Sequence, residues 1–241
     1  MEPLQPHDLT ISERDLAVLQ VVARFKQLTS SHIHKLLYAS VSYAPSNRAL
    51  RRLTAANLLQ RVERRIPGGS RGGSGQYVYQ LGSRGYYLFN TGRFAPPRTV
   101  NHHTLAIADC YVTLAQLARA ELLEVLGVST EPDCWRHVGG IELKPDMLAH
   151  VRPRGRADVK LWLEIDMGTE GQRQLRGKLE SYWRAYQDAD EHEVFPLVVW
   201  VAIDAPRAQE LAWLVSQGPR DAQALFRVTT RQTLANLFMS H

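Results

Sequence analysis

The sequence predicts an α+β protein of two domains, and three observations support this prediction. Charge is divided unevenly: residues 1–100 hold 14 Lys and Arg against 5 Asp and Glu, whereas residues 101–241 hold 15 against 19. The first half shows three helical patterns followed by two strand patterns, and the second half shows the order α-β-β-β-α-β. A basic half joined to an acidic half indicates domains with different partners, which we place at residues 1–95 and 101–241.

Composition excludes several classes of protein. Of 241 residues, 44% are hydrophobic and 22% are charged, which are ordinary values for globular chains and exclude extensive disorder. No apolar run of about 18 residues occurs and the N-terminus has no secretory signal, so we expect a cytoplasmic protein without membrane association. Cys110 and Cys134 lack the spacing of a zinc site.

The first half begins with three predicted helices. Residues 12–15 resemble a capping box, because the Ser12 oxygen can accept a backbone N–H and acids suit the first turn. This helix is expected to run to about residue 28, and residues 29–31 can cap a second helix. The segment 43–46 contains proline, so we expect the third helix from about Ser46 and its end at Asn57, which tolerates the left-handed conformation.

A basic hairpin is expected after the helices. Strand patterns cover residues 58–66 and 76–81, and a turn rich in Gly, Ser and Arg separates them at residues 67–75. Three short helices followed by such a hairpin form a winged helix-turn-helix. In that fold the third helix fits the major groove of double-stranded DNA, and the hairpin reaches neighbouring phosphates.

Seven arginines are the candidate DNA-binding residues of this domain. On the third helix the arginines lie opposite Leu50 and Leu53, where they can contact guanine edges or phosphates. Those of the hairpin are placed to meet the DNA backbone. The seven are Arg48, Arg51, Arg52, Arg61, Arg64, Arg65 and Arg71. The alternative is a protein-interaction module with a solvated basic face, although only one acid, Glu63, lies between residues 44 and 71.

The second half follows a connector at residues 93–100. Its order suits an α/β core in which helices pack on a mixed sheet. The expected helices are 101–123, 171–188, 205–216 and one at the C-terminus, and the expected strands are 135–138, 144–151, 160–167, 195–203 and 224–229.

Three carboxylates are candidate metal ligands in this core. Glu164 and Asp166 share one face of a strand, because alternate residues of a strand point the same way. Asp146 begins the preceding strand and would join them if residues 152–156 form a hairpin turn. Oxygen ligands of this kind suit Mg²⁺. The alternative is that these acids are solvated or paired with arginine.

Several of these segments resemble the replication-relaxation family of bacterial plasmids and integrative elements. The resemblance covers about residues 10–205, and its most specific part is the E-x-D-x-G-T-E run at 164–170 with the later Lys178 and Tyr182. Its other parts are the Arg-rich third helix, the hairpin, the Asn-His-His start at 101–103 and Pro145-Asp146. The family is associated with plasmid replication and DNA relaxation, so the resemblance implies both.

The second domain also resembles the PD-(D/E)xK nuclease core, which is of restriction-endonuclease-like type. The resemblance makes Asp146 and Glu164 the metal-holding acids, but the lysine expected two residues after Glu164 is Asp166. A carboxylate cannot supply the positive charge that stabilises a transferring phosphate. Lys178, one helix later, is the candidate replacement and completes the candidate catalytic set. Mg²⁺ is therefore expected only if the site is active.

Three functions follow as alternatives. The preferred one is a DNA-binding protein of a mobile element, whose degenerate nuclease-like domain serves assembly with replication or transfer proteins. The second is a Mg²⁺-dependent endonuclease that nicks DNA. The third is a transcriptional regulator whose acidic domain senses a ligand or forms a homodimer.

Overall fold

The computed structural model describes the backbone of residues 11–68, 73–189 and 194–239, with side chains outside residues 63–75. Its contacts divide the chain into two compact units, Met1–Ala108 and Asp109–His241. The division falls inside helix α5 (His102–Arg119), later than the connector where we expected it. The first turn of α5 belongs to unit 1 because Leu105 packs against the buried Val62 and Val78 of the hairpin.

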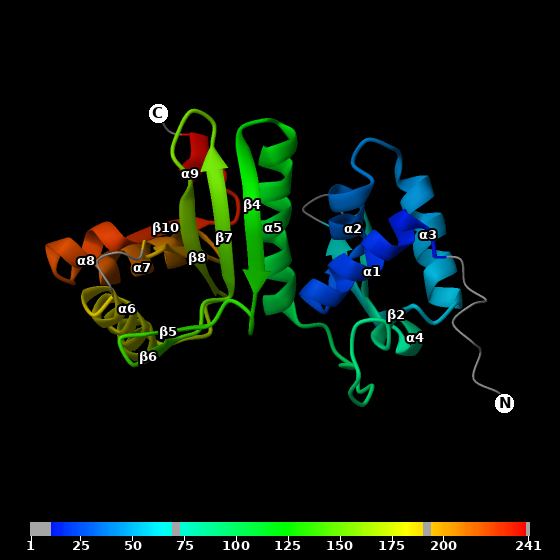
Figure 1. The fold of residues 1–241 in the computed structure, drawn as a ribbon, viewed down its shortest axis with the longest axis horizontal. Helices are drawn as coiled ribbons and strands as arrows, with labels where there is room; N and C mark the ends of the chain where they lie inside the picture. The colour runs from blue at the N-terminus through cyan, green and yellow to red at the C-terminus, as the bar shows by residue number, and fades with distance from the viewer. Residues whose placement is uncertain (1–10, 69–72, 190–193, 240–241) are drawn as a thin grey trace. The chain divides into compact units, whose positions relative to one another are not determined.

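Unit 1 contains short helices and a small antiparallel sheet (Figure 1). Strand β3 lies between β1 and β2 and is antiparallel to both. Buried apolar residues from all three main helices form the core, including Leu19, Ile33 and Leu50. The elements are α1 (Glu13–Phe25), β1 (Leu28–Thr29), α2 (Ser30–Leu37), α3 (Tyr43–Ala55), β2 (Leu59–Gly68), β3 (Gly73–Leu81) and α4 (Ser83–Tyr86).

The helix ends of unit 1 follow the expected capping, with two corrections. The first is that α1 ends at Phe25 and not near residue 28, where β1 begins. Ser12 Oγ accepts a hydrogen bond from the Asp15 amide at 3.2 Å, and Asn57 follows α3 with φ 56°. The second correction is that α3 begins at Tyr43 and not near Ser46. Pro45 lies in its first turn, where the missing proline N–H breaks no helical hydrogen bond.

A buried glutamine fixes the connector to unit 1. The Gln27 side chain is 1% exposed, and its Nε2 donates to the carbonyl of Thr99 at 3.0 Å. Its Oε1 accepts from the Asn101 amide at 2.8 Å. Because a buried amide must satisfy its hydrogen bonds, residues 99–101 are tied to this unit.

Unit 2 is built on a five-stranded mixed sheet in the order β10-β9-β8-β7-β4. Strands β8, β9 and β10 are parallel, whereas β7 is antiparallel to both β8 and β4. A separate hairpin is formed by β5 and β6. After α5 the elements are β4 (Leu123–Thr130), β5 (Arg136–Val138), β6 (Ile141–Leu143), β7 (Met147–Pro153), β8 (Val159–Asp166), α6 (Gln172–Gln187), β9 (Leu197–Ala202), α7 (Ala205–Ser216), α8 (Arg220–Leu225), β10 (Phe226–Thr230) and α9 (Asn236–Met239).

The first strand of this sheet was missed by the sequence analysis. We expected the first strand at residues 135–138, but that segment is β5 of the small hairpin, and β4 takes the place in the sheet. The register of β4 shifts between Val125 and Gly127, so its side-chain alternation is interrupted. An interrupted alternation hides a strand from a search for the two-residue period.

Helices α6 and α7 pack on one face of the sheet of unit 2. Leu175 and Leu179 of α6 and Leu211 of α7 form one buried cluster with Trp162 of β8 and Trp200 of β9. This packing brings the side chains of α6 toward the C-terminal end of β8, where Glu164 and Asp166 lie. In the part of the chain that the structure describes, no helix is both long and apolar enough to cross a membrane.

Candidate nucleic-acid interface and buried carboxylate site

Helix α3 presents arginine to solvent and leucine to the core. Leu50 and Leu53 are 1% and 2% exposed and pack inside unit 1, whereas Arg48 and Arg51 are exposed. The helical period therefore places the two arginines on the outer surface, as the sequence indicates. Their charges are available to an anionic partner.

Arg52 is also exposed, but it forms an ion pair inside unit 1 as well. Its Nη2 lies 2.6 Å and 2.7 Å from the two carboxylate oxygens of Asp15, whose side chain is only 8% exposed. The pair joins α3 to α1 and neutralises a largely buried acid. This contact spans 37 residues of sequence, so no local pattern revealed it.

Arg14 is a basic residue that the sequence analysis did not select. Its guanidinium carbon lies 5.4 Å from the centre of the Tyr38 ring, a cation–π distance. Together with Arg48 and Arg52 it lines a hollow of about 180 Å³ between α1 and α3.

The structure places only one of the four hairpin arginines. The Arg61 guanidinium carbon lies 4.0 Å from the centre of the Tyr77 ring across the β2–β3 pair. The side chains of Arg64 and Arg65, and the whole of Arg71, lie outside the described residues. Their expected contacts with the DNA backbone stay predictions.

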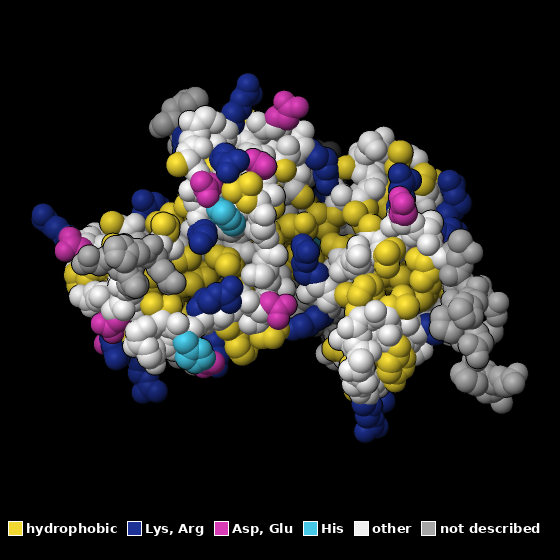
Figure 2. Space-filling model, viewed as in Figure 1, with side chains coloured by type: hydrophobic (Ala, Val, Ile, Leu, Met, Phe, Trp, Pro, Cys, Tyr) yellow, Lys and Arg dark blue, Asp and Glu magenta, His cyan; other side chains and the backbone are white. Residues whose placement is uncertain are grey.

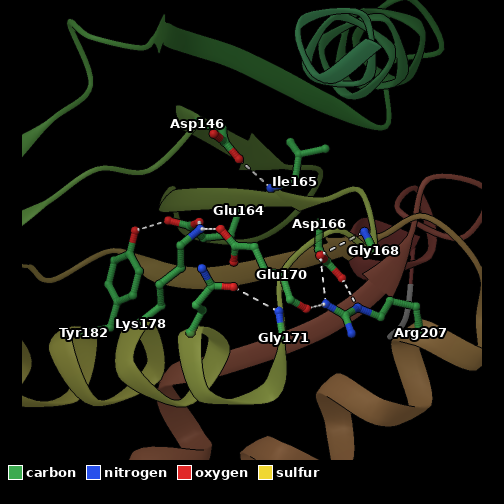
Figure 3. A network of polar contacts seen from close by, with 11 residues as sticks. Asp146, Glu164, Ile165, Asp166, Gly168, Glu170, Gly171, Lys178, Tyr182 and Arg207 are labelled. Atoms are coloured by element: carbon green, nitrogen blue, oxygen red, sulfur yellow. Dashed lines mark hydrogen bonds and ion pairs between the residues drawn. The ribbon is translucent and has the colours of Figure 1, made fainter.

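The site in unit 2 is centred on Glu164 in β8, which is 3% exposed. Its Oε1 accepts a hydrogen bond from the Tyr182 hydroxyl at 2.5 Å, and its Oε2 lies 3.3 Å from Lys178 Nζ (Figure 3). Lys178 Nζ also lies 2.9 Å from Glu170 Oε1. Lys178 and Tyr182 are one turn apart on α6, so they reach Glu164 from the same side.

The environment of Glu164 changes its acidity. Burial, together with the nearby negative charge of Asp146, raises the pKa of Glu164 to about 7. Burial lowers the pKa of Lys178, but Glu164 and Glu170 outweigh that effect and leave its pKa raised. Burial and the Glu164 charge also raise the pKa of Tyr182 well above its usual range, so its hydroxyl stays a donor.

Asp146 is brought beside Glu164 by the β7–β8 hairpin. The register pairs Met147 with Leu163, so the residue before β7 lies next to Glu164. Asp146 Oδ2 accepts a hydrogen bond from the Ile165 amide at 2.6 Å (Figure 3). The turn at residues 152–156 is therefore a hairpin turn, which was the condition for this acid to join the others.

Asp166 is not held as the third carboxylate of a cluster. It shares a face with Glu164, but both of its oxygens bind the Arg207 guanidinium from α7. The side chains of Asp166 and Arg207 are 2% and 11% exposed. Within the described residues, no group of three acids, histidines or cysteines has the geometry to hold a metal ion. We expected three carboxylates around one cation, and a buried arginine occupies one of them instead.

The same arginine fixes the loop between β8 and α6. Arg207 Nη2 donates to the Glu170 carbonyl at 2.7 Å, and Asp166 Oδ1 accepts from the Gly168 amide at 3.1 Å. Gly168 has φ 75°, a conformation that glycine adopts without strain. The E-x-D-x-G-T-E run thus forms a clamped turn that places Glu170 beside Lys178.

These features define a two-unit α/β protein with an arginine-bearing helix in unit 1 and a buried Glu-Lys-Tyr site in unit 2. The family model for replication-relaxation proteins matches residues 19–198, which is most of the chain, and the chain belongs to this family. A comparison with the curated proteins finds no match.

Two solved structures show a distant likeness, one of restriction endonuclease FokI and one of FokI bound to DNA. The first has a TM-score of 0.31 and 11% identity, and the match covers 95% of this chain and 45% of FokI. The second has a TM-score of 0.29 and 9% identity, covering 92% and 43%. This chain thus spans less than half the length of the FokI chains, and likenesses this distant do not define its fold.

Proposed function

We propose that this protein binds double-stranded DNA through unit 1 and acts in plasmid replication or DNA relaxation. The observation that carries the proposal is the outer surface of α3, where Arg48 and Arg51 are exposed and face no acid of their own helix. An arginine of this kind contacts guanine edges in the major groove or phosphates beside it. Membership of the replication-relaxation family supports the biological setting.

The proposal assigns unit 1 to the winged helix-turn-helix class. Three helices precede a β-hairpin whose third strand partner is the short β1. In this class the third helix enters the major groove and the hairpin approaches the backbone. Arg52 of α3 and Arg14 of α1 line the same hollow and would meet phosphates at the edge of the same groove.

A selection from random duplexes with the full chain tests this function. Wild-type protein should enrich a DNA sequence, and Arg51→Ala should relax the preference at particular base positions, because a base contact is lost. Arg14→Ala should instead weaken binding to all sequences alike. Failure of the wild-type chain to bind any duplex would refute the proposal.

For unit 2 we propose a nuclease-like domain that serves assembly with replication or transfer proteins. Both oxygens of Glu164 are engaged by Tyr182 and Lys178, and Asp166 is engaged by Arg207. As they stand, these residues do not fit a Mg²⁺ ion, which needs carboxylate oxygens in its first shell. The buried polar network is instead suited to fixing the end of β8 against α6.

A second candidate function, a Mg²⁺-dependent endonuclease, is favoured by one contact. Lys178 Nζ lies 3.3 Å from Glu164 Oε2, beside Asp146. A lysine therefore accompanies the two acids, although the position two residues after Glu164 in β8, where a lysine is expected, holds Asp166. In this candidate Glu164 would first have to release Tyr182 or Lys178; Asp146 and Glu164 would then hold the metal, and Lys178 would place positive charge beside the phosphate.

Nicking of supercoiled plasmid separates the two candidates for unit 2. An endonuclease would nick in Mg²⁺, and Glu164→Gln and Lys178→Met would each abolish nicking. The control is Glu180→Gln, which changes an exposed glutamate of the same helix. Equal and complete absence of nicking in wild type and variants supports the assembly role.

A further inference from the structure

The solvent-facing side of α3 carries a polar residue that the fold does not use. The buried residues of this helix lie on one side, and the opposite face consists of exposed residues within about a third of a turn. These are Ala44, Asn47, Arg48, Arg51 and Ala55. In Figure 2 dark blue side chains lie over the position that α3 has in Figure 1. The two arginines are already assigned to DNA, and Asn47 is the neutral hydrogen-bonding residue beside them.

Asn47 has no structural role that accounts for its presence in α3. Within the part of the chain that the structure describes, its side chain makes no hydrogen bond, and the residue is exposed. Its carboxamide therefore faces solvent with both N–H donors and the oxygen acceptor available. Asparagine is also a weaker helix former than alanine, so it lowers the stability of α3 without a compensating contact. The residue is suited to a partner outside the chain.

The first turn of α3, which precedes Asn47, is held against α2. The ring of His34, a residue that is 8% exposed, stacks on the ring of Tyr43 with 3.7 Å between the ring centres. His34 Nδ1 also lies 3.2 Å from Ser46 Oγ, and this hydroxyl donates to the Tyr43 carbonyl at 2.9 Å. These contacts set the direction of Asn47 before DNA is bound. A surface that is already ordered loses less entropy on binding.

The neighbours of Asn47 allow α3 to approach DNA closely. Ala44 lies about one turn before Asn47 and presents only a methyl group, so the helix can lie near the base edges of a major groove. Arg51 lies four residues after Asn47, which is about 6 Å along the helix axis. Successive base pairs are about 3.4 Å apart. The two side chains can therefore reach base pairs that are one or two steps apart.

The chemistry of the carboxamide identifies the base that Asn47 would read. In the major groove adenine presents the N7 acceptor beside the N6 amino donor, and one carboxamide can donate to the first while it accepts from the second. An arginine has donors only, so it matches the two acceptors of guanine instead. The two residue types on this face of α3 therefore suit different purines.

We propose that Asn47 is a specificity-determining residue that reads one adenine of the DNA site. The adenine lies one or two base pairs from the base that Arg51 contacts. This inference rests on the proposed binding of duplex DNA by unit 1, and it adds the kind of base pair that the protein recognises. It assigns Asn47 to base edges and not to phosphates, so its loss affects the choice of sequence.

Selection from random duplexes with the full chain, followed by binding measurements on the enriched duplex, tests the inference. The duplexes that wild type enriches should share an adenine, and Asn47→Ala should relax the preference at that position alone. The affinity of Asn47→Ala for the enriched duplex should be about 5- to 150-fold lower than that of wild type, which is the loss expected for one good base contact through two hydrogen bonds.

A base analogue tests the same contact from the DNA side. 7-Deazaadenine at the shared position lacks the N7 acceptor but still pairs with thymine, so wild type should bind this duplex more weakly than the unmodified one. Asn47→Ala should bind the two duplexes equally, because it has no contact with N7 to lose.

Gln20→Ala is the matched control, because it removes an exposed carboxamide from α1 of the same unit. It should change neither the enriched sequence nor the affinity. Urea denaturation should give Asn47→Ala a midpoint equal to or above that of wild type, since alanine is the better helix former.

Three results would overturn the inference. The first is an Asn47→Ala variant that enriches the same sequence as wild type, with affinity lowered for all duplexes alike or not lowered at all. The second is equal binding of wild type to the 7-deazaadenine duplex and the unmodified one. The third is wild-type binding to duplexes without any sequence preference, which would leave the proposed function of unit 1 standing. Failure of wild type to bind any duplex would instead refute that function, and this inference with it.

Discussion

At the scale of single residues, neighbouring arginines of α3 differ in what they do for the protein. Arg48 and Arg51 are exposed and leave the core unaffected, whereas Arg52 neutralises Asp15 on α1. A substitution series that treats the three as equivalent would mix loss of DNA contacts with loss of folding stability. The sequence predicts their outward direction but not this division.

Arg52→Ala should lower the free energy of unfolding by about 1 kcal/mol, because Asp15 loses its hydrogen-bonding partner in a largely buried place. The exposure of Arg52 keeps the effect small. Arg48→Ala and Arg51→Ala should leave the free energy of unfolding within about 0.5 kcal/mol of wild type. Urea denaturation measures all three, and equal stability of the three variants would show that the pair with Asp15 contributes nothing.

Glu164 should make stability depend on pH. In the unfolded chain a glutamate ionises near a pKa of about 4.3, whereas in the folded protein its pKa is raised to about 7. Between these values the folded state binds more protons than the unfolded state. The free energy of unfolding should therefore fall as pH rises through this window and level off above it.

Glu164→Gln should remove this part of the pH dependence, since glutamine does not titrate. Urea denaturation at several values between about pH 5 and pH 8 would show a flatter profile for the variant. Glu180→Gln changes an exposed glutamate of α6, the helix that covers Glu164, and should keep the wild-type profile. Parallel profiles for wild type and Glu164→Gln would mean that burial does not raise this pKa.

At the scale of elements, the turn between β8 and α6 depends on an arginine from α7. Arg207 binds the Asp166 carboxylate and the Glu170 carbonyl, and its Nη1 lies 2.6 Å from Glu210. These contacts fix the turn that places Glu170 beside Lys178. The geometry of the Glu164 site is therefore set partly by a helix that contributes no residue to it.

Arg207→Met should destabilise the protein by about 3–5 kcal/mol, because it leaves the buried Asp166 carboxylate without its charge partner. Glu210→Gln removes only the more exposed partner of the same arginine and should cost less than about 1 kcal/mol. Thermal or urea denaturation of the two variants tests the difference. A small cost for Arg207→Met would show that Asp166 takes up a proton or another partner at little expense.

Element boundaries were predictable where local chemistry determines them. Ser12, Thr29 and Asn57 each fix a helix end through a cap or a left-handed residue, and all three lie as expected. The start of α3 was not predictable from Pro45, because proline fits the first turn of a helix as well as a break. Strand β4 was missed because its register shift interrupts the alternation of side chains.

At the scale of the whole molecule, the candidate site was predictable only in its local part. Strand parity and a hairpin turn are short-range features, so they placed Asp146 beside Glu164 correctly. The assignment of Lys178 to the site came from a family resemblance. Its contact with Glu164 joins β8 to α6, across 14 positions of sequence. The contact between Arg207 and Asp166 joins residues 41 positions apart, and nothing in either segment indicates it.

The division of charge along the chain is the reason to expect the main duplex affinity in unit 1. Residues 1–100 hold 14 Lys and Arg against 5 acids, and like charge in the other half opposes approach to phosphates. Affinity for duplex DNA should therefore fall steeply with salt, by about 0.9 in the logarithmic slope for each phosphate contact.

The most direct test of the central claim is a salt titration of duplex binding with the full chain. The account predicts strong salt dependence for wild type and a loss of about 2–6 kcal/mol in binding free energy for Arg48→Ala with Arg51→Ala, at about 1–3 kcal/mol for each arginine that contacts a base. Arg24→Ala, an exposed change at the far end of α1, should bind as wild type does. Duplex affinity that is independent of salt, or unchanged in the double variant, would contradict the account.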